Sequence, residues 1–386
     1  MDASSSAPEP PSETTGAGPG GTSGSTSSTG STGGSTGEPG DSSGEPGTGG
    51  EPPAGTTGGE PPDDEGTTGA PPGGPDDGKA PVKAPDADLL VALVGDMGTG
   101  SNPKAVYQRV LDEGADFLII LGDYDYADSP TTFFKDMNAV LGDGFPVFGV
   151  IGNHDVSAWG GYQAKFKERL AKIPGAVCSG DLGAASSCTY RGLHFVLSGV
   201  GTIGTKAKQE AYLKDALAAD DSLWSLCLWH KNQRDLQAGD KGDEVGWEAF
   251  KICQQDGSPV MMGHEHSYAR TRALTDIGNK ANGHGAIGMP ELIELAPGRT
   301  FTTVSGLGGK AIRAYEPSLH KADTWWATLY ASNYFRQNGV EKKLVDGADH
   351  GVLFMRFTVD GDPKAAHGYL KSVGGEIIDE FDVVKK

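Results

Sequence analysis

Four short apolar runs in this chain each end at a glycine that is followed directly by a polar, metal-ligating type of residue. The runs cover residues 89–94, 117–121, 147–151 and 260–262. Continuous apolar runs that alternate with helical patterns are typical of buried strands in a largely parallel sheet. Functional side chains in such sheets gather beyond the carboxyl ends of the strands. The pattern therefore predicts an α/β fold with one polar site at the strand ends.

The remaining segments follow the same logic, with further strands expected at 194–197 and 224–229. Helices are expected from about Asn102, acting as N-cap before Pro103, and at 131–141 and 206–219. After Pro297 the pattern becomes β, and we expect a second sheet, packed on the first, from strands at 300–304, 351–359, 368–370 and 376–384. Three segments are too weakly patterned to place, namely 231–246, 275–298 and 306–350.

The N-terminal segment has a composition that cannot form a core. Before Leu89 the chain contains no Leu, Ile, Phe, Tyr or Trp, and Gly, Ser, Thr, Pro and acidic residues dominate. Such a segment has too little apolar surface to offset the entropy of ordering. We therefore predict a disordered tail or spacer over residues 1–85 and a folded domain over 86–386.

Charge and hydropathy argue against nucleic-acid binding and against a membrane-spanning segment. The first 85 residues carry 13 acidic and 2 basic groups, net −11, which leaves −9 of the chain's −20 for the folded part. An acidic domain repels nucleic acid, so none is expected. No run of 18 apolar residues is present, so we expect no transmembrane segment. The chain opens without an apolar leader.

Four cysteines allow three pairings. We favour Cys178 with Cys188, because ten residues of Gly/Ser-rich loop close easily. For Cys227 and Cys253, free buried thiols and a second disulfide remain equally open. A polar tail before a folded domain suggests an extracytoplasmic protein, secreted, periplasmic or tethered to a surface through the tail, with its leader already removed.

The motifs that follow the strands share one kind of chemistry. Their side chains are carboxylates, an amide, a phenol and imidazoles, which are ligands for hard and borderline metal ions. Two such ions a few ångströms apart can clamp a phosphate and activate water to attack it. The motifs are Gly95-Asp96-Met97-Gly98, Gly122-Asp123-Tyr124-Asp125-Tyr126, Gly152-Asn153-His154-Asp155, Trp229-His230 and Gly263-His264-Glu265-His266.

In this order and spacing, the motifs resemble the calcineurin-like metallophosphoesterases, and most closely the catalytic domain of purple acid phosphatases. In the first motif, Asp96-Met97-Gly98, most of the superfamily has a histidine at the third position, where this chain has Gly98. Tyr126 completes the Gly-Asp-x-x-Tyr motif in which a tyrosine replaces that histidine. The resemblance implies a four-layer α/β/β/α sandwich, with two packed mixed sheets flanked by helices. The β-sandwich domain that precedes the catalytic domain in many plant members has no counterpart here.

The resemblance also implies a role for each residue. Asp123 would bridge two metal ions. Ferric iron would be bound by Asp96, Tyr126 and His266. A divalent zinc, manganese or iron ion would be bound by Asn153, His230 and His264. The catalytic residues would be His154, as phosphate contact or proton donor, and Asp155, orienting that imidazole. The substrate contacts would be Asn153, His154, Lys231 and Arg270.

These roles predict a metal-dependent phosphoric ester hydrolase of the acid phosphatase type. A hydroxide that bridges the two metals would attack a small phosphate monoester. A phosphodiesterase on the same site is the alternative, because the core motifs do not distinguish the two. A surface-tethered protein that binds metal or phosphate without turnover is the third reading.

Overall fold

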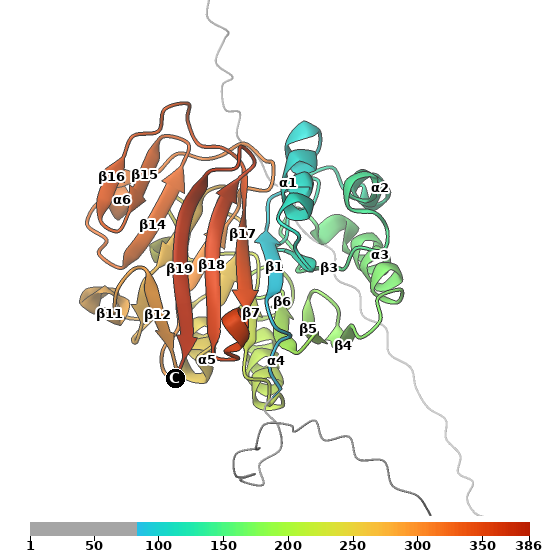
Figure 1. Ribbon diagram of the computed structural model, residues 1–386, viewed down its shortest axis with the longest axis horizontal. Helices are drawn as coiled ribbons and strands as arrows, with labels where there is room; N and C mark the ends of the chain where they lie inside the picture. The colour runs from blue at the N-terminus through green and yellow to red at the C-terminus, as the bar shows by residue number, and fades with distance from the viewer. Residues whose placement is uncertain (1–82) are drawn as a thin grey trace, which may run out of the picture. The chain divides into compact units, whose positions relative to one another are not determined.

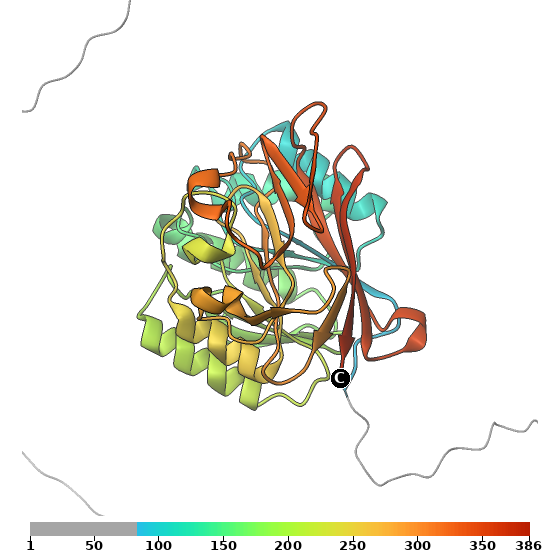
Figure 2. The same ribbon diagram turned by 90° about the vertical axis from the view of Figure 1, so that its left-hand side faces the viewer.

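A computed structural model describes residues 83–386 of the protein (Figures 1 and 2). The predicted tail therefore lies outside the described residues, apart from its last three positions, 83–85. Of these, Lys83 forms a β-bridge with Ser222. Within the described part, no helix is both long and apolar enough to cross a membrane.

The first large sheet has seven strands, and the first three motifs follow three of them, β1 (Leu89–Val94), β2 (Phe117–Ile120) and β3 (Val147–Gly149). Strands β1, β2 and β3 are parallel neighbours, as predicted. On its other side β1 pairs antiparallel with β17, with Leu89 opposite Phe357. The strands in spatial order are β12 (Leu292–Leu295), β19 (Ile377–Lys385), β18 (Ala365–Ser372), β17 (Gly351–Phe357), β1 (Leu89–Val94), β2 (Phe117–Ile120) and β3 (Val147–Gly149).

The second large sheet has ten strands and supplies the later motifs. In its centre four adjacent strands are parallel to one another, namely β6, β7, β8 and β13. The strands in spatial order are β16 (Val340–Lys342), β15 (Tyr334–Gln337), β14 (Trp326–Ala331), β9 (Tyr268–Thr271), β13 (Thr302–Ser305), β8 (Val260–Met262), β7 (Ser225–Leu228), β6 (Leu193–Ser198), β5 (Ala185–Tyr190) and β4 (Val177–Asp181). A small separate sheet pairs β10 (Ala273–Leu274) with β11 (Ala286–Ile287).

The division of strands between the sheets differs from the prediction. The late strands β17, β18 and β19 do not form a sheet of their own but extend the one that begins with β1, and Figure 1 looks onto their outer face. β13 instead joins β8 and β9 in the other sheet. Local sequence patterns identify strands but not their distant partners, which is why the strands were found and their pairing was not.

Helices flank the two sheets, which confirms the predicted class of two packed mixed sheets with helices (Figures 1 and 2). α1 to α3 lie beside β1–β3, whereas α4 and α5 pack on each other beside the ten-stranded sheet. The α-helices are α1 (Ser101–Asp112), α2 (Pro130–Leu141), α3 (Trp159–Leu170), α4 (Lys206–Ala218), α5 (Trp247–Asp256) and α6 (Pro317–His320). The 3₁₀ turns are Val156–Ala158, Arg234–Leu236, Lys280–Gly285 and Val359–Gly361.

The start of α1 corrects a detail of the prediction. The helix begins at Ser101 after Gly100, so Asn102 lies inside the first turn instead of capping it. Its side chain donates a hydrogen bond to the Gly309 carbonyl (3.3 Å). Asn102 therefore links the helix to a loop far along the chain.

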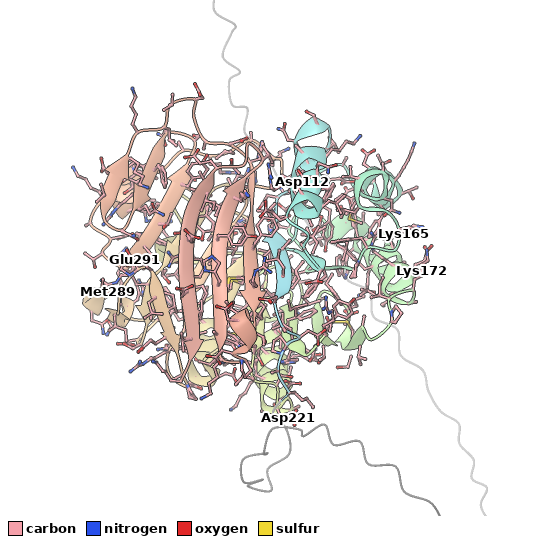
Figure 3. All side chains as sticks on the ribbon, in the orientation of Figure 1. Asp112, Lys165, Lys172, Asp221, Met289 and Glu291 are labelled. Atoms are coloured by element: carbon pink, nitrogen blue, oxygen red, sulfur yellow. A yellow bond between two sulfur atoms is a disulfide. The ribbon has the colours of Figure 1, made fainter. Side chains whose placement is uncertain are left out.

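Aromatic side chains join the two sheets at the core. Phe117 of β2 stacks on Phe195 of β6 with ring centroids 6.0 Å apart, and Phe148 of β3 meets the same ring edge-on at 4.8 Å. Each buried aromatic removes a large apolar area from water, which stabilises the contact between sheets. Charged side chains such as Lys165 and Lys172 instead project outward on the side of α3 (Figure 3).

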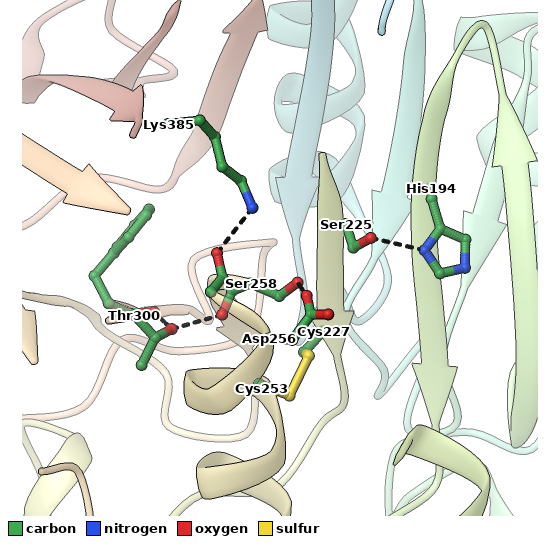
Figure 4. Close-up of a disulfide and its surroundings, with 10 residues drawn as sticks. His194, Ser225, Cys227, Cys253, Asp256, Ser258, Thr300 and Lys385 are labelled. Atoms are coloured by element: carbon green, nitrogen blue, oxygen red, sulfur yellow. Dashed lines mark hydrogen bonds between the residues drawn. A yellow bond between two sulfur atoms is a disulfide. The ribbon is translucent and has the colours of Figure 1, made fainter. Parts of the chain in front are cut away.

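Both pairs of cysteines form disulfides. Cys178 and Cys188 are directly opposite each other on β4 and β5, which confirms the predicted pairing. Cys227 of β7 is bonded to Cys253 of α5 (Figure 4), so the second pairing is also a disulfide. This bond ties the helix to the strand that leads to His230.

Candidate functional site

Sharp turns after the strands bring the predicted motifs together. Asp96, Asp123, Tyr126 and His264 all have positive φ angles, between 56° and 72°. Gly122 leaves no room for a side chain, since a Cβ there would lie 2.6 Å from Nδ1 of His230. Such strained or crowded backbone is typical of functional sites, where the surrounding fold holds it in place.

A first group of donor atoms comes from Asp96, Tyr126 and His266. The Tyr126 hydroxyl lies 3.1 Å from Asp96 Oδ1 and 3.0 Å from His266 Nε2. The His266 Nε2 and Asp96 Oδ1 atoms are 3.4 Å apart. The structure thus places a carboxylate, a phenol and an imidazole around one point.

A second group comes from Asn153, His230 and His264. His230 Nε2 lies 3.2 Å from Asn153 Oδ1 and 3.2 Å from His264 Nδ1. The same nitrogen is 3.2 Å from Asp123 Oδ1. Donor atoms of Asp123, His230 and His264 all lie within 4.8 Å of one another, as a metal site requires.

Asp123 lies between the two groups and is surrounded by favourable partners. Its Oδ1 accepts a hydrogen bond from the His154 backbone N–H (2.9 Å). Burial opposes ionisation of this carboxyl, but His230 beside it holds its pKa below the ordinary value. Asp96 Oδ2 accepts a hydrogen bond from the His264 backbone N–H (2.8 Å), but burial raises the pKa of Asp96 to about 7 despite the attraction of His230. Two buried carboxylates so close together favour a bound cation.

Each of the three histidines directs one ring nitrogen into the groups and its other nitrogen at a fixed partner. His230 Nδ1 lies 2.7 Å from the Leu121 carbonyl, and His266 Nδ1 lies 3.0 Å from the Ala311 carbonyl. A carbonyl at this distance keeps the proton on Nδ1, which leaves Nε2 as an electron donor. Partners of this kind orient metal-ligating histidines and select their tautomer.

His264 differs because its partner is a carboxylate that no sequence motif predicted. Its Nε2 lies 2.7 Å from Glu244 Oε2, in a close electrostatic contact that is too bent for a linear hydrogen bond. The other oxygen of Glu244 accepts a hydrogen bond from Lys231 Nζ (2.6 Å). Lys231, predicted to contact substrate, is therefore engaged with Glu244. Both residues belong to the unplaced segment 231–246, which carries no motif.

His154 and Asp155 have separate surroundings, contrary to the prediction that one orients the other. Asp155 is buried, and its two oxygens accept hydrogen bonds from the backbone N–H groups of Gly152, Asp123 and Tyr124 (2.7–2.9 Å). It therefore holds the two loops together and has no oxygen directed at the imidazole. His154 is exposed, and its ring lies 4.6 Å from that of Tyr126.

The structure does not bring Arg270 to this cluster, so its predicted role as a substrate contact is wrong. Its side chain is fully buried. Arg270 Nε and Nη2 donate to the two oxygens of Asp379 at 2.5 and 2.9 Å. Because Arg270 lies on β9 and Asp379 on β19, the pair joins the two sheets. A guanidinium that is buried and paired in this way cannot reach a phosphate at the cluster.

The donor set fits a pair of metal ions. One group contains carboxylate and phenol oxygens, which suit a hard trivalent ion, and the other is rich in imidazole, which suits a divalent ion. The convergence of seven such side chains is unnecessary for packing, and two of them are carboxylates. The site residues predicted as ligands are thus all in one place, although ligation itself is a prediction.

Comparisons with known proteins agree with this geometry. The family model of the calcineurin-like phosphoesterases matches residues 89–268. No curated protein matches the chain. Among solved structures, the purple acid phosphatase PPD1 from yellow lupin (Lupinus luteus) seeds superimposes with a TM-score of 0.57 at 16% identity. That match covers 79% of this chain but 55% of the lupin chain, so the protein spans about half the length of this relative.

Two other structures match more loosely. GAP50, the anchor in the inner membrane complex of Plasmodium, gives a TM-score of 0.48 at 11% identity, over 78% of this chain and 90% of that one. PhoD gives 0.47 at 10% identity, over 77% and 73%. At these identities the likeness to the lupin enzyme concerns the fold, whereas the family model also covers the five motifs up to His266. Residues 89–268 of this chain therefore form a calcineurin-like phosphoesterase domain.

Proposed function

We propose that this protein is a binuclear metal-dependent hydrolase of phosphate monoesters, of the purple acid phosphatase type. One observation carries the proposal: two groups of metal-ligating atoms share Asp123 between them. A site for one metal needs no carboxylate between two donor groups, whereas a carboxylate in that position can bridge a pair of ions. The fold likeness to a purple acid phosphatase supports the same reading.

In this proposal the two groups differ in the ion that they hold. Asp96, Tyr126 and His266 bind ferric iron, and Asn153, His230 and His264 bind zinc, manganese or ferrous iron. When bound, the two ions supply Lewis-acid stabilisation of the phosphate and an activated water. The protein's part is to fix the donor positions, through the partners of the histidines and through Asp155 beneath the loops.

His154 is the residue that we assign to the substrate. Its backbone N–H is fixed on Asp123, while its side chain is exposed beside the Tyr126 ring. An imidazole in this position can donate a hydrogen bond to a phosphate oxygen or a proton to the leaving alcohol. The Asn153 amide, next to it in sequence, is a second candidate contact.

We also propose that the protein works outside the cytoplasm. Its two disulfides support this location, since disulfides persist in oxidising compartments. The composition of residues 1–85 suits a spacer that holds the folded domain away from a surface.

The proposal is tested by comparing initial rates on p-nitrophenyl phosphate and bis-p-nitrophenyl phosphate, using one preparation whose metal content is measured. Faster cleavage of the monoester with two metals per chain supports it. Faster cleavage of the diester would make the protein a phosphodiesterase on the same site. If the protein binds metal but cleaves neither ester, it would be a binding protein and not a hydrolase.

A second test addresses the iron and its tyrosine. Charge transfer from a tyrosinate to ferric iron would colour the protein, and Tyr126→Phe should remove that colour while sparing the fold. The absorption spectrum and circular dichroism of both proteins measure this. Colour that survives the substitution would mean that another residue binds the iron.

A further inference from the structure

Three cationic side chains come from segments that border the predicted metal ligands, although the whole chain has a net charge of −20. They are Lys241, Lys310 and Arg313. We call the predicted ligands the metal-ligand cluster: Asp96, Asp123, Tyr126, Asn153, His230, His264 and His266. Within residues 83–386, none of the three cations forms an ion pair with a carboxylate. Lys231, the fourth cation near the cluster, is by contrast paired with Glu244.

Two of these residues are anchored by their backbones to the first donor group. The Lys310 N–H donates to the Asp96 carbonyl (3.0 Å), and the Arg313 N–H donates to the His266 carbonyl (2.8 Å). The preceding glycines allow this close approach. A Cβ on Gly308 would lie 2.4 Å from the Gly95 carbonyl oxygen, and one on Gly309 would lie 2.4 Å from that of Met97. The loop is therefore built to lie against the site.

The Lys310 ammonium lies over the ring of one predicted ligand. Its Nζ lies 4.1 Å from the centroid of the Tyr126 ring. The His154 ring packs on the same tyrosine, and the tyrosine hydroxyl contacts Asp96 and His266. Lys310 and His154 are thus attached to one side chain of the ligand cluster.

Arg313 and Lys241 are two further cations near the metal-ligand cluster. Arg313 is exposed and Lys241 is half-buried. The segment that carries Lys241 lies against Glu265, because a Cβ on Gly239 would be 2.4 Å from Glu265 Oε1. Burial lowers the pKa of Lys241, and the charge of Arg313 lowers it further. The opposing charges are Glu265, which is buried beneath them without a hydrogen-bond partner among the described residues, and the exposed Asp240.

We propose that Lys310, Arg313 and Lys241 form a cationic rim that binds a second phosphate group of the substrate. The preferred esters would then carry two phosphates, one held at the metal-ligand cluster and the other on the rim. Guanidinium and ammonium groups bind phosphate oxygens through charge-assisted hydrogen bonds, and none of these three cations is held in an ion pair among the described residues. This inference rests on the proposed function of the same site.

The test compares the binding of inorganic phosphate and pyrophosphate to the metal-loaded protein by calorimetry. We expect pyrophosphate to bind more tightly than phosphate. Arg313→Gln and Lys310→Met should each weaken pyrophosphate binding about tenfold, as expected for one charge-assisted hydrogen bond, and phosphate binding by much less. Lys321→Gln, an exposed lysine away from the rim, is the matched control.

Steady-state rates give a second readout that separates this inference from the proposed function. Arg313→Gln should raise KM for a nucleoside diphosphate about tenfold and leave kcat and the kinetics on p-nitrophenyl phosphate unchanged. The proposed rim would be wrong if the wild type bound phosphate and pyrophosphate with equal affinity. It would also be wrong if the variants lost affinity for both anions equally. If the wild type cleaves no ester, the proposed function fails, and the binding data still decide whether the rim exists.

Discussion

Two clusters of buried charge contain residues that are close together in the sequence, yet their charges are paired in different ways. His264 and His266 point into the metal-ligand cluster, whereas Arg270 forms an ion pair with Asp379. Tyr268 and Thr328 also donate to Asp379, at 2.8 and 2.7 Å, so every oxygen of that carboxylate is satisfied. Asp96 and Asp123 have no buried guanidinium or ammonium partner within the described residues, and imidazoles and a phenol surround them.

The difference separates structural from functional buried charge. A buried charge is tolerated when it is paired and hydrogen-bonded, and removing one partner is costly. A cluster that keeps more carboxylate than its protein partners can neutralise is arranged for something that the protein alone does not supply. Burial alone therefore does not distinguish the two clusters, whereas the pairing of their carboxylates with a buried guanidinium does.

The strongest way to test this comparison is Asp123→Asn, which removes the carboxylate that both donor groups share. We expect the metal content to fall below two per chain. Phosphatase activity should drop by about 1,000-fold or more, because stabilisation worth several kcal/mol is lost.

The matched control is Asp128→Asn, the same change at an exposed position nearby. Metal analysis and initial rates on p-nitrophenyl phosphate measure both variants. An active Asp123→Asn protein that binds no metal would remove the basis of the site assignment.

Asp379→Asn should produce the reverse result, a large loss of stability without a loss of metal. Leaving Arg270 buried and unpaired should cost about 3–5 kcal/mol in the free energy of unfolding. Urea titration measures this cost, and Asp382→Asn on the same strand, in an exposed ion pair with His367, should cost about 1 kcal/mol or less. A folded Asp379→Asn protein that has lost its metal would show that the two clusters are coupled.

Glu244→Gln is expected to have an intermediate effect, confined to the second donor group. Losing the carboxylate that contacts His264 should weaken zinc binding there about 10- to 100-fold, with little change in the unfolding free energy. Competition with a chelator measures the affinity. The same substitution at exposed Glu248 should leave it unchanged. Equal affinities in the two variants would show that Glu244 has no part in positioning His264.

The smallest expected effect is on the pH dependence of stability. Burial opposes ionisation of Asp379, but Arg270 lowers its pKa below the ordinary value. The pair therefore stabilises the fold above the unfolded pKa of about 3.9 and loses this contribution as pH falls through the folded pKa. The double variant Arg270→Met/Asp379→Leu lacks this titration, so its metal-free stability should fall less on acidification than that of the wild type. Parallel curves from urea titrations would contradict this.

The sequence predicted the parts of the site that lie at strand ends and missed those in loops. Asp96, Asp123 and His264 each follow an apolar run and a glycine, which is a local pattern. Glu244 and Lys310 lie in segments with no periodicity, and only the folded backbone brings them to the cluster. Arg270 had the opposite outcome. Its place close to the histidines in the sequence suggested a contact with substrate, but strand alternation and burial of the side chain prevent that contact.

The pairing of β1 with β17 has a consequence for how the chain is made. β1 leaves the ribosome early, but its neighbour β17 is synthesised near the end, and until then one edge of β1 has no partner. Such non-local pairing slows folding, since a long loop must close before the contact forms. The strands that carry Asp96 and Asp123 therefore reach their final sheet only when synthesis is almost complete. A nascent chain stalled midway would carry both aspartates and still lack a finished site.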